Sequence, residues 1–309
     1  VANRKDTMVS VKTETPVAKD RMMEVMAALR NTSVNAPVAI GDEVLADVVR
    51  ENMRRMGVEN VEVVTTSAEE YVATCTEQFD WGYADPDRRT AEGKRVVRLE
   101  DCSPDMVALW PALKRITERV AIKNSPLFDV EEAFRIFGDC TVEVLSLAGE
   151  CKEVNIYIDG QGARLAAEAV GRKRIEVKRE EIDNTPCQGE FVAEEYRYLI
   201  IPDVALQKAR LVEYALRGKA DVWSNNSFGF ARTEPEDVLG RVEPIERIEP
   251  FDAKQLKREL KGRGVDIILR DFPMGVDEFR RKTGARSGNE VRLALTKIKG
   301  KLYSIYLKK

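Results

Sequence analysis

The chain has 309 residues, 43% hydrophobic and 33% charged, so it is long enough for two or three cores of ordinary domain size. No apolar run approaches the roughly 20 residues that cross a bilayer, so we expect no membrane partner. The absence of histidine excludes Ser-His and Cys-His nucleophiles and removes the commonest metal ligand. Five scattered cysteines without metal-pair spacing predict reduced thiols, a cytoplasmic protein and no metal site.

The net charge of −3 hides an asymmetry along the chain. From residue 251 onward there are 16 Lys and Arg against 7 Asp and Glu, so the rest of the chain is strongly acidic. A basic block on an acidic body favours a surface that faces a polyanion. A lysine-rich solvated face is the alternative.

The first half of the chain alternates short apolar runs with amphipathic segments. Strands are predicted at 38–40, 58–64, 79–86 and 120–123, and helices at 41–57, 67–78, 103–120 and 129–138. Ser67 is a candidate N-cap, Gly57 and Gly138 are candidate helix ends, and Pro111 should bend or divide its helix. One face of the first helix carries Val44, Leu45, Val48, Val49, Met53 and Met56. Such alternation predicts a doubly wound parallel sheet whose ligands lie beyond the carboxyl ends of its strands.

The second half changes pattern. An antiparallel strand pair is predicted at 141–147 and 151–158, and 162–184 is helix-like at first and then charged. Residues 194–218 predict a strand, a Pro-Asp turn and an amphipathic helix. The C-terminal block predicts a basic helix at 252–264, a strand at 265–273, a helix at 275–286 and a strand pair at 290–309 that turns at Lys299-Gly300.

The stretch FDWGYADPDRRT, residues 79–90, combines a predicted buried strand with an acid, a rigid turn and two cations. Asp85, Pro86, Arg88 and Arg89 would then lie at a strand's carboxyl end, where ligands bind in such sheets. A tight turn with surface ion pairs is the alternative. Lys123 and Ser125 follow another strand, where they could contact a substrate or form a strand exit and helix cap.

This stretch, with LEDCSPDMV, IKNSPLFD, GECKEV, YLIIPDVALQKA and RDFPMGVDEFRRK in the same order, resembles class I S-adenosylmethionine-dependent methyltransferases. More narrowly, the chain resembles bacterial methyltransferase-like proteins that end in ferredoxin-like and THUMP-like domains. The resemblance implies an α/β fold, with a Rossmann-like doubly wound sheet followed by two small α+β domains. These would be a Rossmann-like domain at 1–158, a ferredoxin-like domain at 159–239 and a basic THUMP-like domain at 240–309.

The resemblance also implies S-adenosylmethionine as cofactor, with Asp85 and Pro86 lining the pocket between cofactor and acceptor. Arg88 and Arg89 would face a phosphate-bearing substrate or an internal carboxylate. The aromatic residue that usually follows this turn in enzymes acting on exocyclic amino groups is replaced by Asp87 and Arg88.

The cofactor half departs from the family pattern. No first strand and no glycine-rich turn are evident before residue 38. Ile40 stands where an acid should bind the ribose, so Asp42 or Glu43 could serve only after a shift of two or three residues. Ser67 stands where an aspartate lies near the adenine. Either the cofactor site is degenerate, or part of the cofactor-binding segment is missing from this sequence.

THUMP domains are RNA-binding modules, so the resemblance implies tRNA or rRNA as partner, held through its phosphates. The candidate contacts in the basic block are Lys254, Lys257, Arg258, Arg280, Arg281 and Lys282. We therefore expect a methyltransferase-family protein that binds or acts on RNA and whose cofactor site is degenerate. The alternative is an active S-adenosylmethionine-dependent RNA methyltransferase. The oligomeric state is not predicted.

Overall fold

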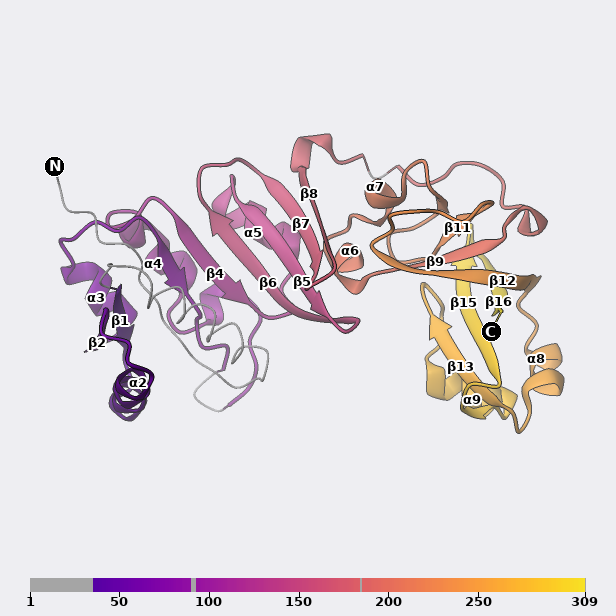
Figure 1. The fold of residues 1–309 in the computed structure, drawn as a ribbon, viewed down its shortest axis with the longest axis horizontal. Helices are drawn as coiled ribbons and strands as arrows, with labels where there is room; N and C mark the ends of the chain where they lie inside the picture. The colour runs from indigo at the N-terminus through magenta and orange to yellow at the C-terminus, as the bar shows by residue number, and fades with distance from the viewer. Residues whose placement is uncertain (1–35, 90–92, 184, 309) are drawn as a thin grey trace. The chain divides into compact units, whose positions relative to one another are not determined.

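The computed structural model describes residues 36–89, 93–183 and 185–308, which form two compact units. Unit 1 holds the described residues up to Leu145 and Lys152–Ala166, and unit 2 holds Ser146–Cys151 and the chain from Ala167 onward. Figure 1 shows their helices and strands, coloured along the chain. The segment before residue 36, in which the sequence contains no glycine-rich turn, lies outside the described residues.

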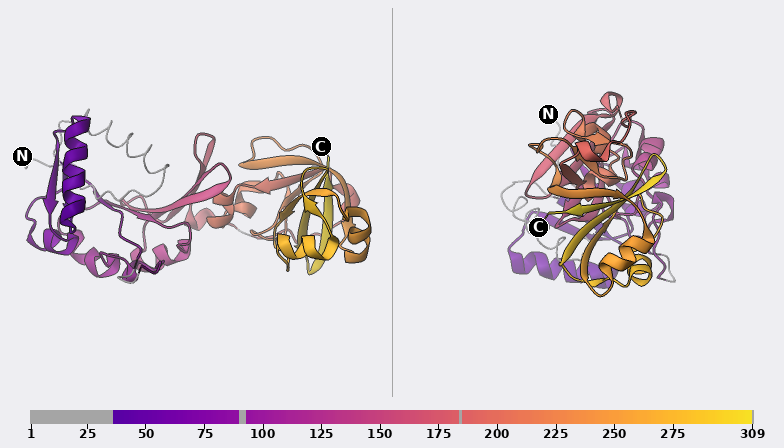
Figure 2. Two further views of the ribbon diagram at one scale, coloured as in Figure 1. Left: turned by 90° about the horizontal axis from the view of Figure 1, so that it is seen from below. Right: turned by 90° about the vertical axis from the view of Figure 1, so that its right-hand side faces the viewer.

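Unit 1 begins with two parallel strands and the helix that joins them, β1 (Ala36–Ile40), α2 (Glu43–Met56) and β2 (Val61–Thr65). Val38 of β1 and Met53 of α2 belong to one buried apolar cluster, and Figure 2 shows α2 running alongside the strands. The helix ends at Gly57, whose φ of 64° is the left-handed conformation expected of this cap.

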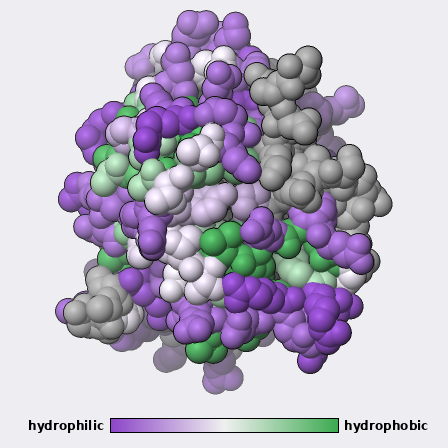
Figure 3. All heavy atoms as spheres, turned by 90° about the vertical axis from the view of Figure 1, so that its left-hand side faces the viewer, coloured by the Kyte–Doolittle hydropathy of each residue, from purple (hydrophilic) through white to green (hydrophobic). Residues whose placement is uncertain are grey.

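The predicted apolar face of α2 is only partly buried. Val49 and Met53 face the cluster, but Val44 is 75% exposed and Val48 is 51% exposed. The six apolar positions cover a wider arc of the helix than these strands bury. Figure 3 shows the molecule from the left-hand side of Figure 1, where apolar side chains lie among hydrophilic ones.

The chain then continues through α3 (Ala68–Thr74), β3 (Gly82–Ala84), the short turn η1 (Leu99–Asp101), α4 (Met106–Leu113), β4 (Val120–Asn124), α5 (Val130–Phe137), β5 (Thr141–Leu147) and β6 (Glu150–Ile158). Pro111 lies within α4 without dividing it. β3 pairs in parallel with β4, placing Ala84 opposite Ile122, and β6 pairs antiparallel to β4. The predicted strand at 79–86 is therefore regular over only three residues.

The sheet of unit 1 is interrupted between β1 and β3. Within the described residues, β1 pairs only with β2 in a two-stranded sheet, and β3 is the first strand of a six-stranded sheet. Tyr83 of β3 packs against the cluster formed by β1 and α2. Within the described residues, β1 and β3 are thus each an edge strand of a separate sheet.

The helix favoured at the start of 162–184 is a wrong prediction. The structure forms β7 (Arg164–Ala169) and β8 (Lys173–Lys178), and the six-stranded order is β3-β4-β6-β5-β7-β8. Ala166 and Ala167 are fully buried in β7, so packing within the sheet overrides the helix propensity of alanine.

Unit 2 contains β8, the end of β7 and the elements that follow them. The helices are α6 (Val204–Lys208), α7 (Val212–Leu216), α8 (Ala253–Leu260) and α9 (Val276–Thr283), with short turns η2 (Arg179–Glu181) and η3 (Ala193–Glu195). The strands are β9 (Tyr198–Pro202), β10 (Asp221–Val222), β11 (Gly229–Ala231), β12 (Gly240–Pro250), β13 (Gly264–Leu269), β14 (Arg286–Ser287), β15 (Val291–Ile298) and β16 (Lys301–Leu307).

One eight-stranded sheet, in the order β10-β11-β9-β12-β16-β15-β13-β14, organises this unit. β12 pairs with β9 over Gly240–Pro244 and with β16 over its second half, after a register shift between Ile245 and Arg247. The helix predicted after Pro202 is divided into α6 and α7 at Arg210, whose φ is 56°. The C-terminal strand pair turns at Lys299 and Gly300 as predicted.

Alternate residues of β13 separate two apolar clusters. Ile268 packs in the cluster that contains Leu199 and Phe230, whereas Ile267 and Leu269 pack in the cluster beneath α8 and α9. Phe279 of α9 is fully buried there. Figure 2 shows both helices beside the strands of this part of the sheet.

Candidate functional site

The residues predicted to bind a cofactor lie at the carboxyl ends of β1 and β2, where they cap helices. The Asp42 carboxylate accepts a hydrogen bond from the Leu45 N–H at 2.8 Å, and the Ser67 hydroxyl accepts one from the Glu70 N–H at 3.1 Å. These are N-cap contacts of α2 and α3. Glu43 is exposed in the first turn of α2, and Ile40 is buried.

Parallel pairing brings these two strand ends together. The Thr66 N–H donates to the Ile40 carbonyl at 3.0 Å. A Cβ added at Gly41 would lie 3.7 Å from the Ser67 Cα, which is ordinary contact. The structure therefore gathers Asp42 and Ser67 at one edge, but each oxygen already stabilises its own helix.

Asp85, which follows β3, and Lys123, near the end of β4, form an ion pair in the structure. Both were predicted from the sequence as candidate site residues, but their contact with each other was not. Lys123 Nζ donates to Asp85 Oδ2 at 2.9 Å, and their side chains are only 15% and 8% exposed. The parallel register explains the pair, because Ala84 lies opposite Ile122 and the next residues are Asp85 and Lys123. A buried ion pair is favourable only when its two groups are well oriented toward each other. If one partner is removed, the other charge is left buried without compensation.

Next to this ion pair lies a group of buried polar side chains on β5 and β6, which was not predicted from the sequence. Lys123 lies opposite Asn155 of β6. The Asn155 amide donates to Glu143 at 3.3 Å and to Glu153 at 3.4 Å, and the Tyr157 hydroxyl donates to Glu143 at 2.9 Å. Glu143, Glu153 and Asn155 are all buried. The signal was the alternation of polar and apolar residues in CKEVNIYI, which indicates a strand with one polar face.

The rest of the acid-proline corner is fastened to the segment before α4. Pro86 is buried, and Asp87 exchanges two backbone hydrogen bonds with Ser103, of 2.7 and 2.9 Å. The Arg88 carbonyl accepts from the Val96 N–H at 2.9 Å, and Arg89 is exposed. The corner is thus a rigid strand exit at the carboxyl edge.

Ser125, the other residue predicted to contact a substrate, forms a local turn after β4. Its hydroxyl accepts a hydrogen bond from the Leu127 N–H at 3.1 Å, and its carbonyl accepts one from the Phe128 N–H at 3.0 Å. This geometry matches the strand-exit alternative. Leu127 is 66% exposed on the same loop, an apolar side chain open to solvent.

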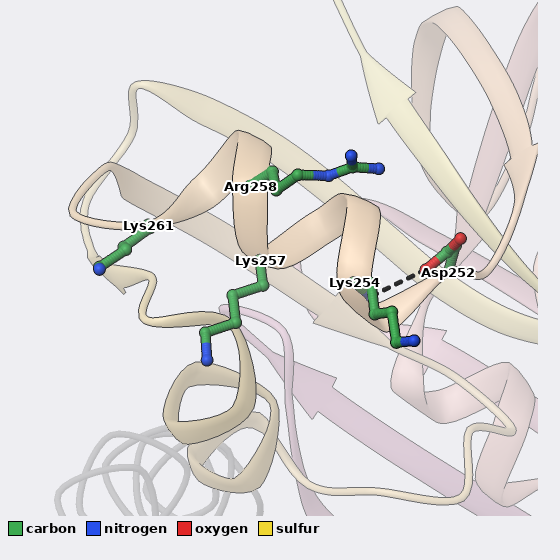
Figure 4. A pocket seen from close by; sticks show the side chains of 5 residues that line it. All are labelled: Asp252, Lys254, Lys257, Arg258 and Lys261. Atoms are coloured by element: carbon green, nitrogen blue, oxygen red, sulfur yellow. Dashed lines mark hydrogen bonds between the residues drawn. The ribbon is translucent and has the colours of Figure 1, made fainter.

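The basic helix of unit 2 forms a second candidate site, which we call the α8 surface. A hollow of about 490 Å³ is lined by Asp252, Lys254, Lys257, Arg258 and Lys261. Lys254, Lys257 and Arg258 lie on the exposed side of α8, and Lys261 follows the helix as its C-cap; Figure 4 shows the four side chains extending outward. Asp252 is engaged as the N-cap, accepting from the Lys254 and Gln255 N–H groups at 2.8 and 3.1 Å.

The cations of the α8 surface differ from those predicted on α9. Among the described residues, none of Lys254, Lys257, Arg258 and Lys261 forms an ion pair. On α9, Lys282 is paired with Glu278 at 2.8 Å, Arg280 Nη2 lies 3.4 Å from the Ser287 hydroxyl, and Arg281 is exposed. The capping hydrogen bonds from the Gln255 and Lys254 N–H groups, together with the nearby positive charge of Arg258 and Lys254, lower the pKa of Asp252 below its usual value.

The described part of the chain contains no cluster of three or more metal-ligating side chains. Within the same residues, none of the helices has the length and apolar character needed to cross a membrane. None of the five cysteines, all of which lie in the described part of the chain, forms a disulfide bond.

Two family models match parts of the chain. Residues 240–308 match a family described as THUMP domain-like, and residues 1–65 match one described as Protein of unknown function (DUF1667). The chain therefore contains a THUMP-like domain that includes the α8 surface. No curated protein matches the chain.

Among solved structures, a protein from Porphyromonas gingivalis W83 classed as a methyltransferase matches with a TM-score of 0.78. It is 22% identical, and the match covers 99% of this chain and 77% of that chain. A SAM dependent methyltransferase from Aquifex aeolicus matches at 0.34, with 14% identity over 51% of this chain and 85% of that chain. A Streptococcus mutans protein classed as a methyltransferase, in complex with SAH, matches at 0.33, with 12% identity over 50% and 89%. The first match confirms the predicted methyltransferase-like α/β fold.

Proposed function

We propose that this protein binds RNA on a methyltransferase fold through its THUMP-like domain, and that its S-adenosylmethionine site is not intact. The observation that carries the RNA proposal is the α8 surface, where four exposed cations line one hollow without internal ion pairs among the described residues. Phosphate groups bind such cations with release of counterions. The family match at 240–308 supports the same partner.

The residues at the carboxyl edge do not fit a cofactor site. Asp42 and Ser67 use side-chain oxygens as helix caps, and the Ile40 side chain offers no oxygen where a ribose-binding acid is expected. Asp85 is neutralised by Lys123. We infer no methyl-transfer step from these residues, and the roles of Asp85, Pro86, Arg88 and Arg89 in catalysis remain a hypothesis.

One observation favours the second candidate, an active RNA methyltransferase. β1 and β3 are each an edge strand of a separate sheet within the described residues. A strand supplied by polypeptide outside those residues would pair with both edges and could bring a phosphate-binding or cofactor-binding turn with it. We also propose that the chain divides into a Rossmann-like domain at 1–158, a ferredoxin-like domain at 159–239 and a THUMP-like domain at 240–309.

Calorimetric titration with S-adenosylmethionine separates the two candidates. We expect no heat of binding at millimolar cofactor. Stoichiometric binding would contradict the degenerate site and support the enzyme.

The RNA proposal is tested by tRNA mobility shift at low salt. We expect Lys257→Glu to weaken tRNA binding about tenfold. The slope of log affinity against log salt concentration should fall by about one, as expected for the loss of one phosphate contact. Arg172→Glu is the matched control, because it makes the same charge change at an exposed position in the turn between β7 and β8. Equal loss in both variants would show a general charge effect, and an unshifted tRNA with the wild-type protein would end the RNA proposal.

A further inference from the structure

The helices α8 and α9 pack on one face of the sheet and meet at their C-terminal ends. Leu256 of α8 and Phe279 of α9 belong to one buried cluster. The Gly262 N–H, just beyond α8, donates at 2.9 Å to the carbonyl of Gly284, the C-cap of α9. A Cβ added at Gly284 would lie only 3.3 Å from the Lys261 Cγ, so a glycine here lets the two helix ends approach closely.

One arginine on each helix points away from the sheet. Arg258 of α8 and Arg281 of α9 each lie two residues before one buried residue and two residues after another. The buried residues are Leu256 and Leu260 on α8 and Phe279 and Thr283 on α9. An α-helix turns about 100° per residue, so a position midway between two buried residues lies on the opposite side of the helix. Arg258 and Arg281 therefore occupy equivalent exposed positions on neighbouring helices.

Hydrogen bonds on one flank of α8 fix which side of the helix faces outward. The Glu259 carboxylate accepts from the Tyr306 hydroxyl at 2.7 Å and from Arg247 Nη2 at 3.0 Å. The Gln255 amide donates to Glu259 at 2.9 Å and to Glu249 at 3.2 Å. This flank is thereby attached to β12 and β16, and the outward side of α8 is left to its cations.

The three cations in the last turn of α9 have different surroundings. Arg280 Nη2 lies 3.4 Å from the Ser287 hydroxyl of β14, so Arg280 extends toward that edge of the sheet. Lys282 forms an exposed ion pair with Glu278 at 2.8 Å. The side chain of Arg281 forms neither kind of contact among the described residues. Arg281 is thus the cation of this turn that faces the same side as Arg258.

The outward side of the two helices offers no aromatic ring for a base to stack on. The aromatic residues between 251 and 290 are Phe251, Phe272 and Phe279. Phe251 and Phe272 are half-buried and pack against each other with ring centroids 5.2 Å apart, and Phe279 is fully buried. Proteins that bind single strands stack bases on exposed aromatics, whereas duplex RNA is bound through its phosphates and shape. The surface fits a duplex.

We propose that Arg258 and Arg281 contact the two backbones of an RNA duplex that lies across α8 and α9. This inference rests on the proposed RNA function and adds the class of RNA and a second point of contact. Helices packed side by side have axes about 8–10 Å apart, so the two guanidiniums reach phosphates on different strands. Each guanidinium presents a planar fork of donors that matches two phosphate oxygens.

The class of RNA is tested by mobility shift of the full chain at low salt. The two probes are an RNA hairpin with a stem of about 16 base pairs and a polyuridine strand of the same number of nucleotides. We expect the hairpin to bind about tenfold more tightly, because its phosphates are denser and lie on two strands. Equal or tighter binding of polyuridine would overturn the duplex inference but leave RNA binding in place. If neither probe shifts, the proposed function fails as well.

The second point of contact is tested with one variant and a matched control. Arg281→Glu should weaken hairpin binding about tenfold and lower the slope of log affinity against log salt concentration by about one. Arg286→Glu makes the same charge change at an exposed position nearby. The β14 register places Ser287 on the face covered by α9 and Arg286 on the opposite face, so this variant should bind like the wild type.

Two outcomes would contradict the role of Arg281. One is an equal loss of affinity in Arg281→Glu and Arg286→Glu. The other is an unchanged affinity in Arg281→Glu when Lys257→Glu weakens binding, which would confine RNA to α8 and leave the proposed function standing. The neutral variant Arg281→Gln should also lower the salt slope by about one, and thermal unfolding shows that each variant is folded.

Discussion

At the carboxyl edge of unit 1, Asp42, Ser67 and Asp85 are engaged within the protein, whereas the cations of the α8 surface face solvent. Asp42 and Ser67 cap helices and Asp85 neutralises Lys123. Lys257 and Lys261 form no ion pair among the described residues. A polar side chain is free to bind a ligand only when the fold does not already use it. The comparison therefore favours binding in unit 2 over catalysis in unit 1.

The largest expected effect tests the buried ion pair of unit 1. Asp85→Ala should lower the free energy of unfolding by about 3–5 kcal/mol, because it leaves the Lys123 ammonium buried without a partner. The double variant Asp85→Ala, Lys123→Met should recover part of this loss. Urea unfolding measures both. A loss below about 1 kcal/mol in the single variant would show that the pair is not structural.

A buried carboxyl in unit 2 qualifies the comparison, because not every polar group of that unit faces solvent. Glu213 is 7% exposed, and its Oε2 is buried without a hydrogen-bond partner. Burial raises the pKa of Glu213 above its ordinary value of 4.5, although the N–H groups of Glu213 and Asn225 oppose the change. The folded state thus keeps this proton to higher pH than the unfolded chain does, so stability falls as pH rises through that interval.

Glu213→Gln should therefore raise the free energy of unfolding at pH 8 by about 1–3 kcal/mol, and the gain should shrink toward pH 4.5. Chemical unfolding at several pH values measures the difference. The exposed Glu234→Gln is the control and should show no such trend. A gain independent of pH would show that ionisation of Glu213 is not the cause.

The smallest effect concerns the helix caps. Ser67→Ala should cost about 1 kcal/mol of stability because the Glu70 N–H loses its acceptor, whereas Ser67→Asp should retain the cap. Thermal unfolding of the two variants measures the contrast. Equal stability of both would mean that the Ser67 hydroxyl is not needed by α3 and is available for another role.

The parts of the fold that depend only on residues close in sequence, such as helix ends, could be predicted from capping and turn preferences. Gly57 ends α2 and Asp252 begins α8 because each conformation is decided within one turn of helix. The helix favoured after Gly162 was wrong because the alanines of β7 are buried between the strands β5 and β8 of a sheet, which the local pattern does not reveal. The Asp85–Lys123 pair was also hidden, since it depends on a register between residues 38 positions apart.

Candidate residues could be predicted from the sequence where they are exposed and need no particular neighbour in the fold. The α8 cations could be read from helical spacing alone, because nothing in the described fold covers them. The hydrogen bond between Glu143 and Asn155 could not be predicted, because it depends on the alignment of β5 with β6.

The course of β12 has a practical consequence for anyone who wishes to produce the THUMP-like segment alone. Its first five residues form a ladder with β9, and its second half forms one with β16. A fragment cut at residue 240 would keep β12 but lose β9, together with Leu199, Phe228 and Phe230 of the shared core. Such a fragment would present a bare hydrogen-bonding edge beside uncovered apolar side chains and would be prone to self-association. A fragment that begins before Tyr196 preserves that ladder and core.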